Sequence, residues 1–155
     1  MAEPLLITVA PTGAETTKSD CPALPTTLEE LVATARECEA AGAAMIHVHV
    51  RDGEHRPTLD LGLLTETVVA LRASTDLVIQ LSTGGSVHDP LDDRLRVLDA
   101  QPGSCSLTMG STNFGDDVFL NPWPFVVDLH LRAQERGVVP EYELFDLGQV
   151  HALVR

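Results

Sequence analysis

The chain has 155 residues, of which 44% are hydrophobic and 21% charged, a balance typical of one globular domain. Its formal charge of -13 makes nucleic acid and anionic membranes unexpected partners, because both need basic patches. No apolar run is long enough to cross a bilayer, and residues 1–4 lack a basic start typical of a secretory signal. Three widely spaced cysteines favour reduced thiols, so we expect a cytoplasmic protein.

Predicted strands and helices alternate along the chain. Apolar, β-branched runs predict strands, and helical spacing of apolar residues with capping residues predicts helices. The expected strands are 5–9, 45–50, 77–81, 105–109 and 141–145. The expected helices begin at Thr26 or Thr27 and end at Gly42, span about 61–74, begin at 89–90, span 122–136, and cover 147–155.

These elements form five βα units of about thirty residues each, which predicts a parallel sheet with right-handed crossovers. No GxGxxG motif follows the first strand, so a dinucleotide-binding fold has no direct support. Polar and glycine-rich segments fall just after the strands, where a (β/α)8 TIM barrel builds its active site. Such a barrel needs about 250 residues. We therefore expect residues 1–155 to form a single partial barrel domain, its N-terminal half to three-fifths, with an open α/β layer as the alternative.

The segment His47-Val48-His49 ends the second expected strand. Side chains alternate faces along a strand, so the two imidazoles share one face and Ile46, Val48 and Val50 share the other. Two imidazoles on one face can hold one metal ion, and zinc is the metal that suits them best. The alternative is two separately satisfied histidines. Spacing alone leaves both interpretations open.

Further candidates lie in the segments after the other strands. Glu15 follows the first strand and could act as a base, a ligand or a partner for a cationic substrate group, or be a solvated loop residue. Ser82-Thr83-Gly84-Gly85 offers hydroxyls and backbone N–H groups to a carboxylate or phosphate, or is an ordinary turn. The fourth strand ends with further donors, which include Thr108 and Ser111. Asp52 could orient a histidine or pair with an arginine, and Glu141 and Glu143 share one face of the fifth strand.

Five segments occur in an order that resembles the β-keto acid cleavage enzymes, typified by 3-keto-5-aminohexanoate cleavage enzyme. They are 7–14, 47–52, 82–85, 110–115 and 140–146. The resemblance implies a zinc-dependent (β/α)8 barrel in which a β-keto acid and acetyl-CoA give acetoacetate and a new acyl-CoA. It implies that His47 and His49 bind Zn2+. It also implies that Ser82 and Thr108 hold the keto acid, and that Glu15 meets an amino group on the substrate.

The sequence departs from that family in one respect. The resemblance leads us to expect an Arg-x-Gly-Leu-Glu-Asp pattern with the third zinc ligand, and no segment matches it. Three hypotheses remain open: a β-keto acid cleavage enzyme or an N-terminal portion of one, a non-catalytic truncated fragment, and another metal-dependent aldolase, lyase or hydrolase on a similar barrel. A half barrel would expose strand edges, so we expect a homo-oligomer.

Overall fold

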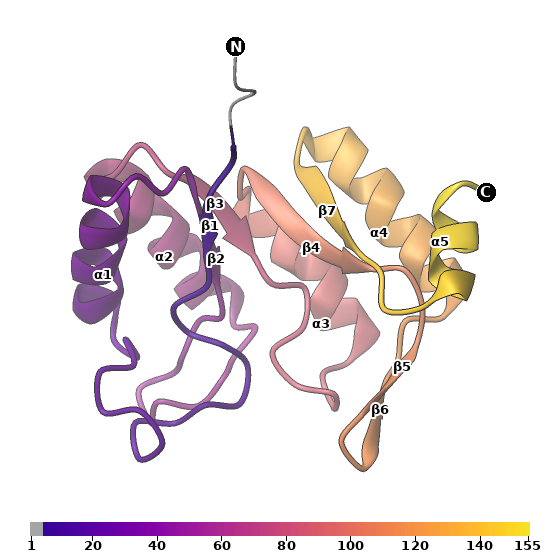
Figure 1. Ribbon diagram of the computed structural model, residues 1–155, viewed down its shortest axis with the longest axis horizontal. Helices are drawn as coiled ribbons and strands as arrows, with labels where there is room; N and C mark the ends of the chain where they lie inside the picture. Colours follow the sequence, from indigo (N-terminus) through magenta and orange to yellow (C-terminus); the bar gives the residue numbers. More distant parts are fainter. Residues whose placement is uncertain (1–4) are drawn as a thin grey trace.

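The computed structural model describes residues 5–155, so the prediction about a secretory signal in residues 1–4 lies outside the described residues. Five parallel strands form one curled sheet in the order β1-β2-β3-β4-β7, an α/β half barrel of TIM-barrel type (Figure 1). These strands are β1 (Thr8–Val9), β2 (Met45–Val48), β3 (Val78–Leu81), β4 (Ser104–Thr108) and β7 (Val139–Glu143). The helices are α1 (Leu28–Ala40), α2 (Leu61–Ser74), α3 (Leu91–Arg96), the 3-10 helix η1 (Val97–Ala100), α4 (Trp123–Arg136) and α5 (Leu147–Leu153).

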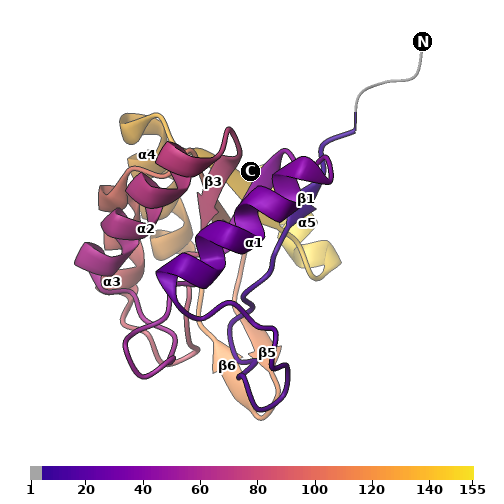
Figure 2. The same cartoon turned by 90° about the vertical axis from the view of Figure 1, so that its left-hand side faces the viewer.

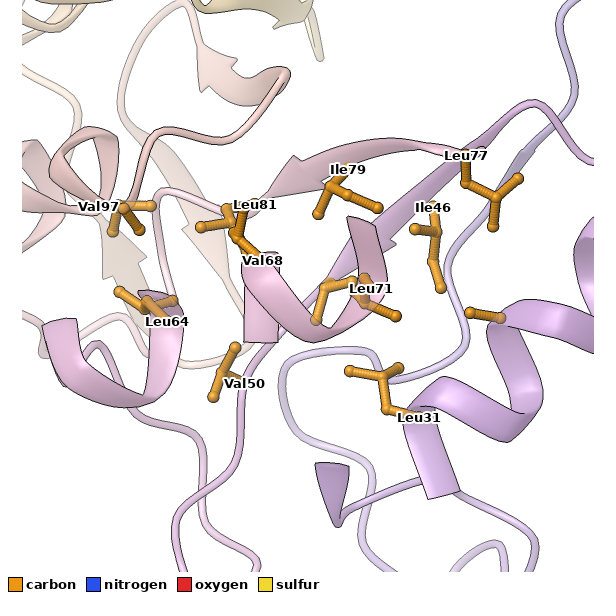
Figure 3. Close-up of a cluster of buried hydrophobic side chains, with 13 residues drawn as sticks. Leu31, Ile46, Val50, Leu64, Val68, Leu71, Leu77, Ile79, Leu81 and Val97 are labelled. Carbon is orange, nitrogen blue, oxygen red and sulfur yellow. The ribbon is translucent and has the colours of Figure 1, made fainter. Parts of the chain in front are cut away.

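The outer face of the sheet is apolar because alternate strand residues point toward the helices. Ile46, Ile79 and Leu81 pack against Leu64 and Leu71 of α2, and all five side chains are at most 2% exposed (Figure 3). A second cluster of buried side chains joins β4 to α4, and its members include Cys105, Leu107, Phe125, Leu129 and Ala133. The prediction that Ile46, Val48 and Val50 share the face opposite the histidines is confirmed by their burial in the first cluster.

The loops that follow the strands gather at one end of the sheet, as expected for parallel strands (Figure 1). A two-stranded antiparallel hairpin, β5 (Thr112–Phe114) and β6 (Asp117–Phe119), projects from the same end (Figures 1 and 2). This end therefore carries the polar segments that follow β1, β2, β3 and β4, which the sequence singled out for chemistry.

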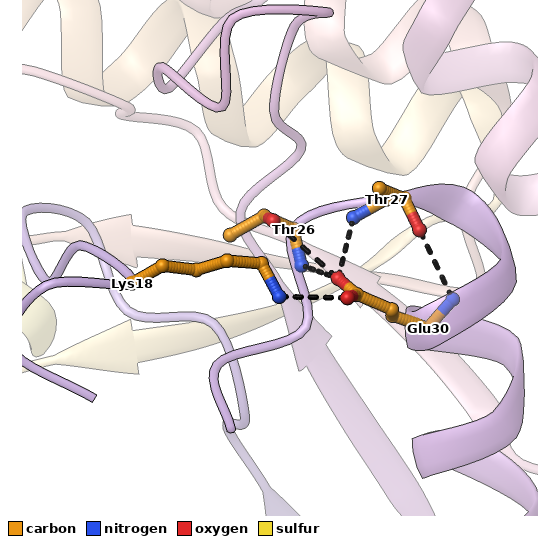
Figure 4. Close-up of polar contacts among 4 residues, drawn as sticks. All are labelled: Lys18, Thr26, Thr27 and Glu30. Carbon is orange, nitrogen blue, oxygen red and sulfur yellow. Dashed lines mark hydrogen bonds and ion pairs between the residues drawn. The ribbon is translucent and has the colours of Figure 1, made fainter. Parts of the chain in front are cut away.

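The N-terminus of α1 is tied to the loop that follows β1. The side chain of Thr27 accepts from the Glu30 amide, and the Glu30 carboxylate accepts in return from the Thr27 amide (Figure 4). Lys18 in the preceding loop donates to the same carboxylate at 2.7 Å, and this contact, with the backbone N–H groups, lowers the pKa of Glu30 to about 2. Of the two predicted caps, Thr27 is the one that forms.

Several predicted boundaries are wrong by a few residues. The first strand is Thr8–Val9 rather than 5–9. It lies at the edge of the sheet, and the residues that precede it, Leu5, Leu6 and Ile7, are exposed. The last strand begins at Val139 rather than 141, since Gly137 adopts a left-handed conformation (φ 66°) and ends α4 at once. Within residues 5–155 no helix combines the length and apolar character that a bilayer-spanning segment needs.

Candidate active site

The inner face of the curled sheet is lined by polar side chains from neighbouring strands. His47 on β2 lies in register with Gln80 on β3, and Gln80 in turn with Ser104 on β4. The Nε2 atoms of His47 and His49 lie 3.2 Å apart, so the two imidazoles converge as the sequence predicts.

A buried glutamine fixes the proton on His47. Gln80 is 1% exposed, and its Nε2 donates to Ser104 Oγ at 2.9 Å and to Glu141 Oε2 at 3.2 Å. Its Oε1 therefore faces His47 Nδ1 at 2.6 Å, where it can only accept. This contact places the His47 proton on Nδ1 and leaves Nε2 unprotonated, with its lone pair facing His49 Nε2.

His49 is held neutral by its surroundings. Burial, then the proximity of His47 and Arg51, lowers the pKa of His49 to about 4. Its backbone N–H donates to Thr12 Oγ1 at 2.8 Å, and its Nδ1 is buried without a hydrogen-bond partner among the described residues. A neutral imidazole is the form that binds a metal.

The histidine pair has the geometry of two metal ligands. Zinc bound tetrahedrally to two imidazole nitrogens at about 2.0–2.1 Å holds them roughly 3.3 Å apart, close to the 3.2 Å found here. Gln80 supplies the outer hydrogen bond that metal-binding histidines normally make. Within residues 5–155, no cluster of three or more His, Cys, Asp or Glu side chains could complete such a site. The residues present fit two of the three protein ligands that catalytic zinc usually takes.

The two imidazoles open into a cavity of about 370 Å³ at the loop end of the sheet. The loop after β1 contributes Ala14 and Glu15, and the segment after β3 contributes residues 82–87. Other side chains come from β4, the hairpin and the end of β7: Ser106, Thr108, Thr112, Asn113, Phe114, Phe119, Glu143 and Phe145.

The structure brings most of the predicted site residues to this cavity. Glu15, Ser82, Thr83, Gly84, Gly85 and Thr108 line it together with His47 and His49. Thr108 Oγ1 donates to Glu143 Oε2 at 2.6 Å, so the β4 hydroxyl and a β7 carboxylate form one unit. Ser111 lies outside the lining, where its hydroxyl accepts from the Asn121 amide at 2.8 Å.

The backbone N–H groups after β3 already have partners within the chain. Those of Gly85 and Ser86 donate to Asp89 Oδ2 at 2.8 and 2.6 Å, and that of Thr83 donates to Ser106 Oγ at 3.2 Å. The expected use of this turn by a substrate carboxylate therefore requires these bonds to exchange. The hydroxyl of Ser82, which is 8% exposed, is also paired within the turn: it donates to Gly84 O at 2.8 Å and accepts from the Gly84 N–H at 3.3 Å.

Arg51 holds the loop that follows β1. Its Nη2 donates to the carbonyl oxygens of Thr12, Gly13 and Thr16 at 3.2, 2.8 and 3.1 Å, and Glu15 lies within that segment. Asp52 turns away from the histidines and pairs with Arg56 at 3.0 Å. Of the two interpretations of Asp52, the structure therefore supports the ion pair.

Comparison with known proteins identifies the family of this chain. The family model for β-keto acid cleavage enzymes matches residues 4–155. The chain belongs to the β-keto acid cleavage enzyme family. It is 39% identical to a 3-keto-5-aminohexanoate cleavage enzyme of Fusobacterium nucleatum and 37% identical to one of Acetoanaerobium sticklandii, over 100% and 99% of its length. It is 32% identical, over 99% of its length, to a 3-oxoadipate:acetyl-CoA acetyltransferase of Cupriavidus necator.

The chain spans 58%, 57% and 54% of the length of those three relatives. Among solved structures, apo ObcA and its binary complex with oxaloacetate share the fold, with TM-scores of 0.72 and 0.73 at 23% identity. Each match covers 84% of this chain, and 32% and 33% of the ObcA chain respectively. The structural likeness therefore covers a part of a larger chain.

Sequence reasoning missed three features of this site. Gln80 is the one polar residue of β3, and that exception in an apolar strand was its only signal in the sequence. The hairpin was not predicted, although the two-residue turn Gly115-Asp116 is a recognised hairpin signal. Arg94, 2% exposed beneath the Ser82–Gly85 turn, carried no signal, because an arginine on a helix is usually solvated.

Proposed function

We propose that this protein is a zinc-dependent β-keto acid cleavage enzyme that exchanges acyl groups between a β-keto acid and acetyl-CoA. In this reaction the bond between the ketone carbon and the α-carbon of the keto acid breaks. The acyl group leaves as an acyl-CoA, and the acetyl group of acetyl-CoA joins the remaining two-carbon acid to give acetoacetate. The observation that carries the proposal is the 3.2 Å convergence of His47 and His49 inside a polar cavity, in a chain of this family.

The residues present suit the requirements of this chemistry. Zinc bound to His47 and His49 would supply a Lewis acid that stabilises negative charge on the ketone oxygen. Gln80 keeps the His47 proton on Nδ1, so that Nε2 remains a ligand. The Thr108 and Ser82 hydroxyls lie in the cavity, where they can hold the carboxylate and carbonyl oxygens of the keto acid.

Glu15 supports a finer proposal about the substrate. Its carboxylate lies at the exposed rim of the cavity, on the loop that Arg51 and Lys18 hold in place. A carboxylate in that position would pair with a cationic group at the far end of the keto acid. We therefore propose that a 3-oxo acid with an amino group is a better substrate than an uncharged one.

The proposal is tested by acyl exchange in the purified, zinc-supplemented protein. Acetyl-CoA and 3-oxohexanoate should give butyryl-CoA, detected by mass spectrometry, and a 5-amino-3-oxohexanoate should react faster. Replacing both His47 and His49 with alanine should abolish the product, while His151→Ala, on the exposed part of α5, should not. Cleavage of the keto acid without acetyl-CoA would instead favour a metal-dependent lyase or aldolase.

A further inference from the structure

Arg94 on α3 is a buried cation that the proposed reaction does not use. It is 2% exposed, and burial lowers its pKa to about 10, which still leaves it charged at neutral pH. Its hydrogen-bond partners are neutral: its Nε donates to Thr83 O at 2.6 Å, Nη1 to Leu120 O at 2.7 Å, and Nη2 to Asn121 Oδ1 at 2.6 Å. Keeping a charge buried in this way is costly, and three short bonds offset that cost.

These contacts join two separate walls of the cavity. Thr83 belongs to the turn after β3, whereas Leu120 and Asn121 directly follow β6 of the hairpin. The guanidinium also lies between the rings of Phe119 and Phe125, at 4.3 and 4.5 Å from their centroids. One side chain therefore fixes the turn, the hairpin and α4 relative to one another.

The turn and the hairpin touch where Arg94 holds them. A Cβ atom added to Gly84 would lie 2.7 Å from Phe119 Cζ, so glycine is what lets the ring pack against the turn. Beyond this contact the hairpin presents Phe114 and Phe119 to the cavity, and the turn presents Ser82. The spacing of the two walls decides how much space lies between Ser82 on the turn and the aromatic side chains of the hairpin.

We propose that Arg94 is a positioning residue that sets the spacing between the Ser82–Gly85 turn and the β5–β6 hairpin, and that this spacing selects the size of the acyl group on the β-keto acid. The inference rests on the proposed function and adds a determinant of substrate size to it. Aromatic side chains suit an apolar acyl chain, and an arginine with three fixed acceptors holds the wall more rigidly than a lysine could.

The test compares Arg94→Lys with the wild-type protein on two substrates, 3-oxopentanoate and 3-oxooctanoate, each with acetyl-CoA. The variant keeps the charge but cannot reach all three acceptors. We expect the ratio of the two KM values to change by about tenfold, comparable to the effect of one methylene in a pocket, with kcat for the shorter acid changing far less. Arg96→Lys is the matched control, because Arg96 lies on the same helix with 58% of its side chain exposed.

An equal loss for both acids would overturn the inference, because it would show a role in folding alone. If Arg94→Lys does not fold, Phe119→Leu decides: it widens the same wall, and an unchanged KM ratio would refute the idea. If the wild-type protein shows no acyl exchange, the proposed function fails separately. The two acids are then compared by calorimetric binding, where the inference requires the same shift in the Kd ratio. Absence of binding, or an unshifted ratio, counts against it.

Discussion

Replacing Gln80 with methionine should weaken metal binding without touching a metal ligand. Gln80 is 1% exposed and makes three side-chain hydrogen bonds, to His47 Nδ1, Ser104 Oγ and Glu141 Oε2. Methionine has nearly the same length and flexibility but forms none of these bonds. His47 would then lose the acceptor that fixes its proton on Nδ1, and its ring would be free to rotate.

The size of the effect follows from the role of such outer hydrogen bonds. Losing one commonly costs about 10–100-fold in metal affinity, which corresponds to roughly 1.4–2.7 kcal/mol. The same substitution leaves a part-buried imidazole N–H without its acceptor, which destabilises the fold by about 1–3 kcal/mol. Gln80→Met should therefore weaken zinc binding by more than tenfold while the protein remains folded at 25 °C.

The assay is competition for zinc against a chromophoric chelator, with urea unfolding measured on the same samples. Gln134→Met, on the exposed side of α4, is the control for replacing a glutamine with methionine elsewhere in the protein, and it should leave zinc affinity unchanged. An unaltered zinc affinity in folded Gln80→Met would refute the argument that Gln80 fixes the His47 tautomer.

Three further predictions concern the frame and the cavity. The folded-state pKa of Glu30 is depressed to about 2, so its stabilising effect is full above about pH 4.5 and is lost as the pH falls toward 2. In urea unfolding across this range, the free energy of unfolding of Glu30→Gln should lie below that of wild type, and the difference should vanish at low pH. A difference that does not change with pH would contradict the role of Lys18. Leu81→Ala should lower the free energy of unfolding by about 2–5 kcal/mol, because Leu81 is fully buried, and a loss below about 1 kcal/mol would show that the core collapses around it. Thr108→Val should lower kcat/KM for the keto acid by about tenfold through loss of one hydrogen-bonding hydroxyl beside Glu143, with bound zinc unchanged; undiminished turnover would place the hydroxyl outside the reaction.

Local periodicity predicted much of this structure. Strand alternation alone placed His47 and His49 on one face and Ile46 in the core, and the βα rhythm predicted a parallel sheet with its polar segments at one end. These features depend on residues close together in the sequence, so a one-dimensional pattern contains them.

Features that depend on contacts between distant segments could not be predicted from the sequence pattern. The register that sets Gln80 beside His47, 33 residues away, is fixed by sheet pairing. The burial of Arg94 depends on the carbonyl oxygens of Thr83, 11 residues earlier, and Leu120, 26 residues later. The pattern of residues along a helix does not reveal such contacts. The hairpin is a local feature, but its strands of three residues each are too short for alternation to be readable, so only the Gly115-Asp116 turn indicated it.

The most direct test of the central claim is a zinc titration of the metal-free protein in which bound metal and acyl exchange are measured in the same samples. The account predicts that formation of acyl-CoA from a 3-oxo acid and acetyl-CoA rises in proportion to bound zinc, and that replacing His47 and His49 removes both. Full acyl exchange in metal-free protein, or stoichiometric zinc binding that survives loss of both histidines, would contradict it.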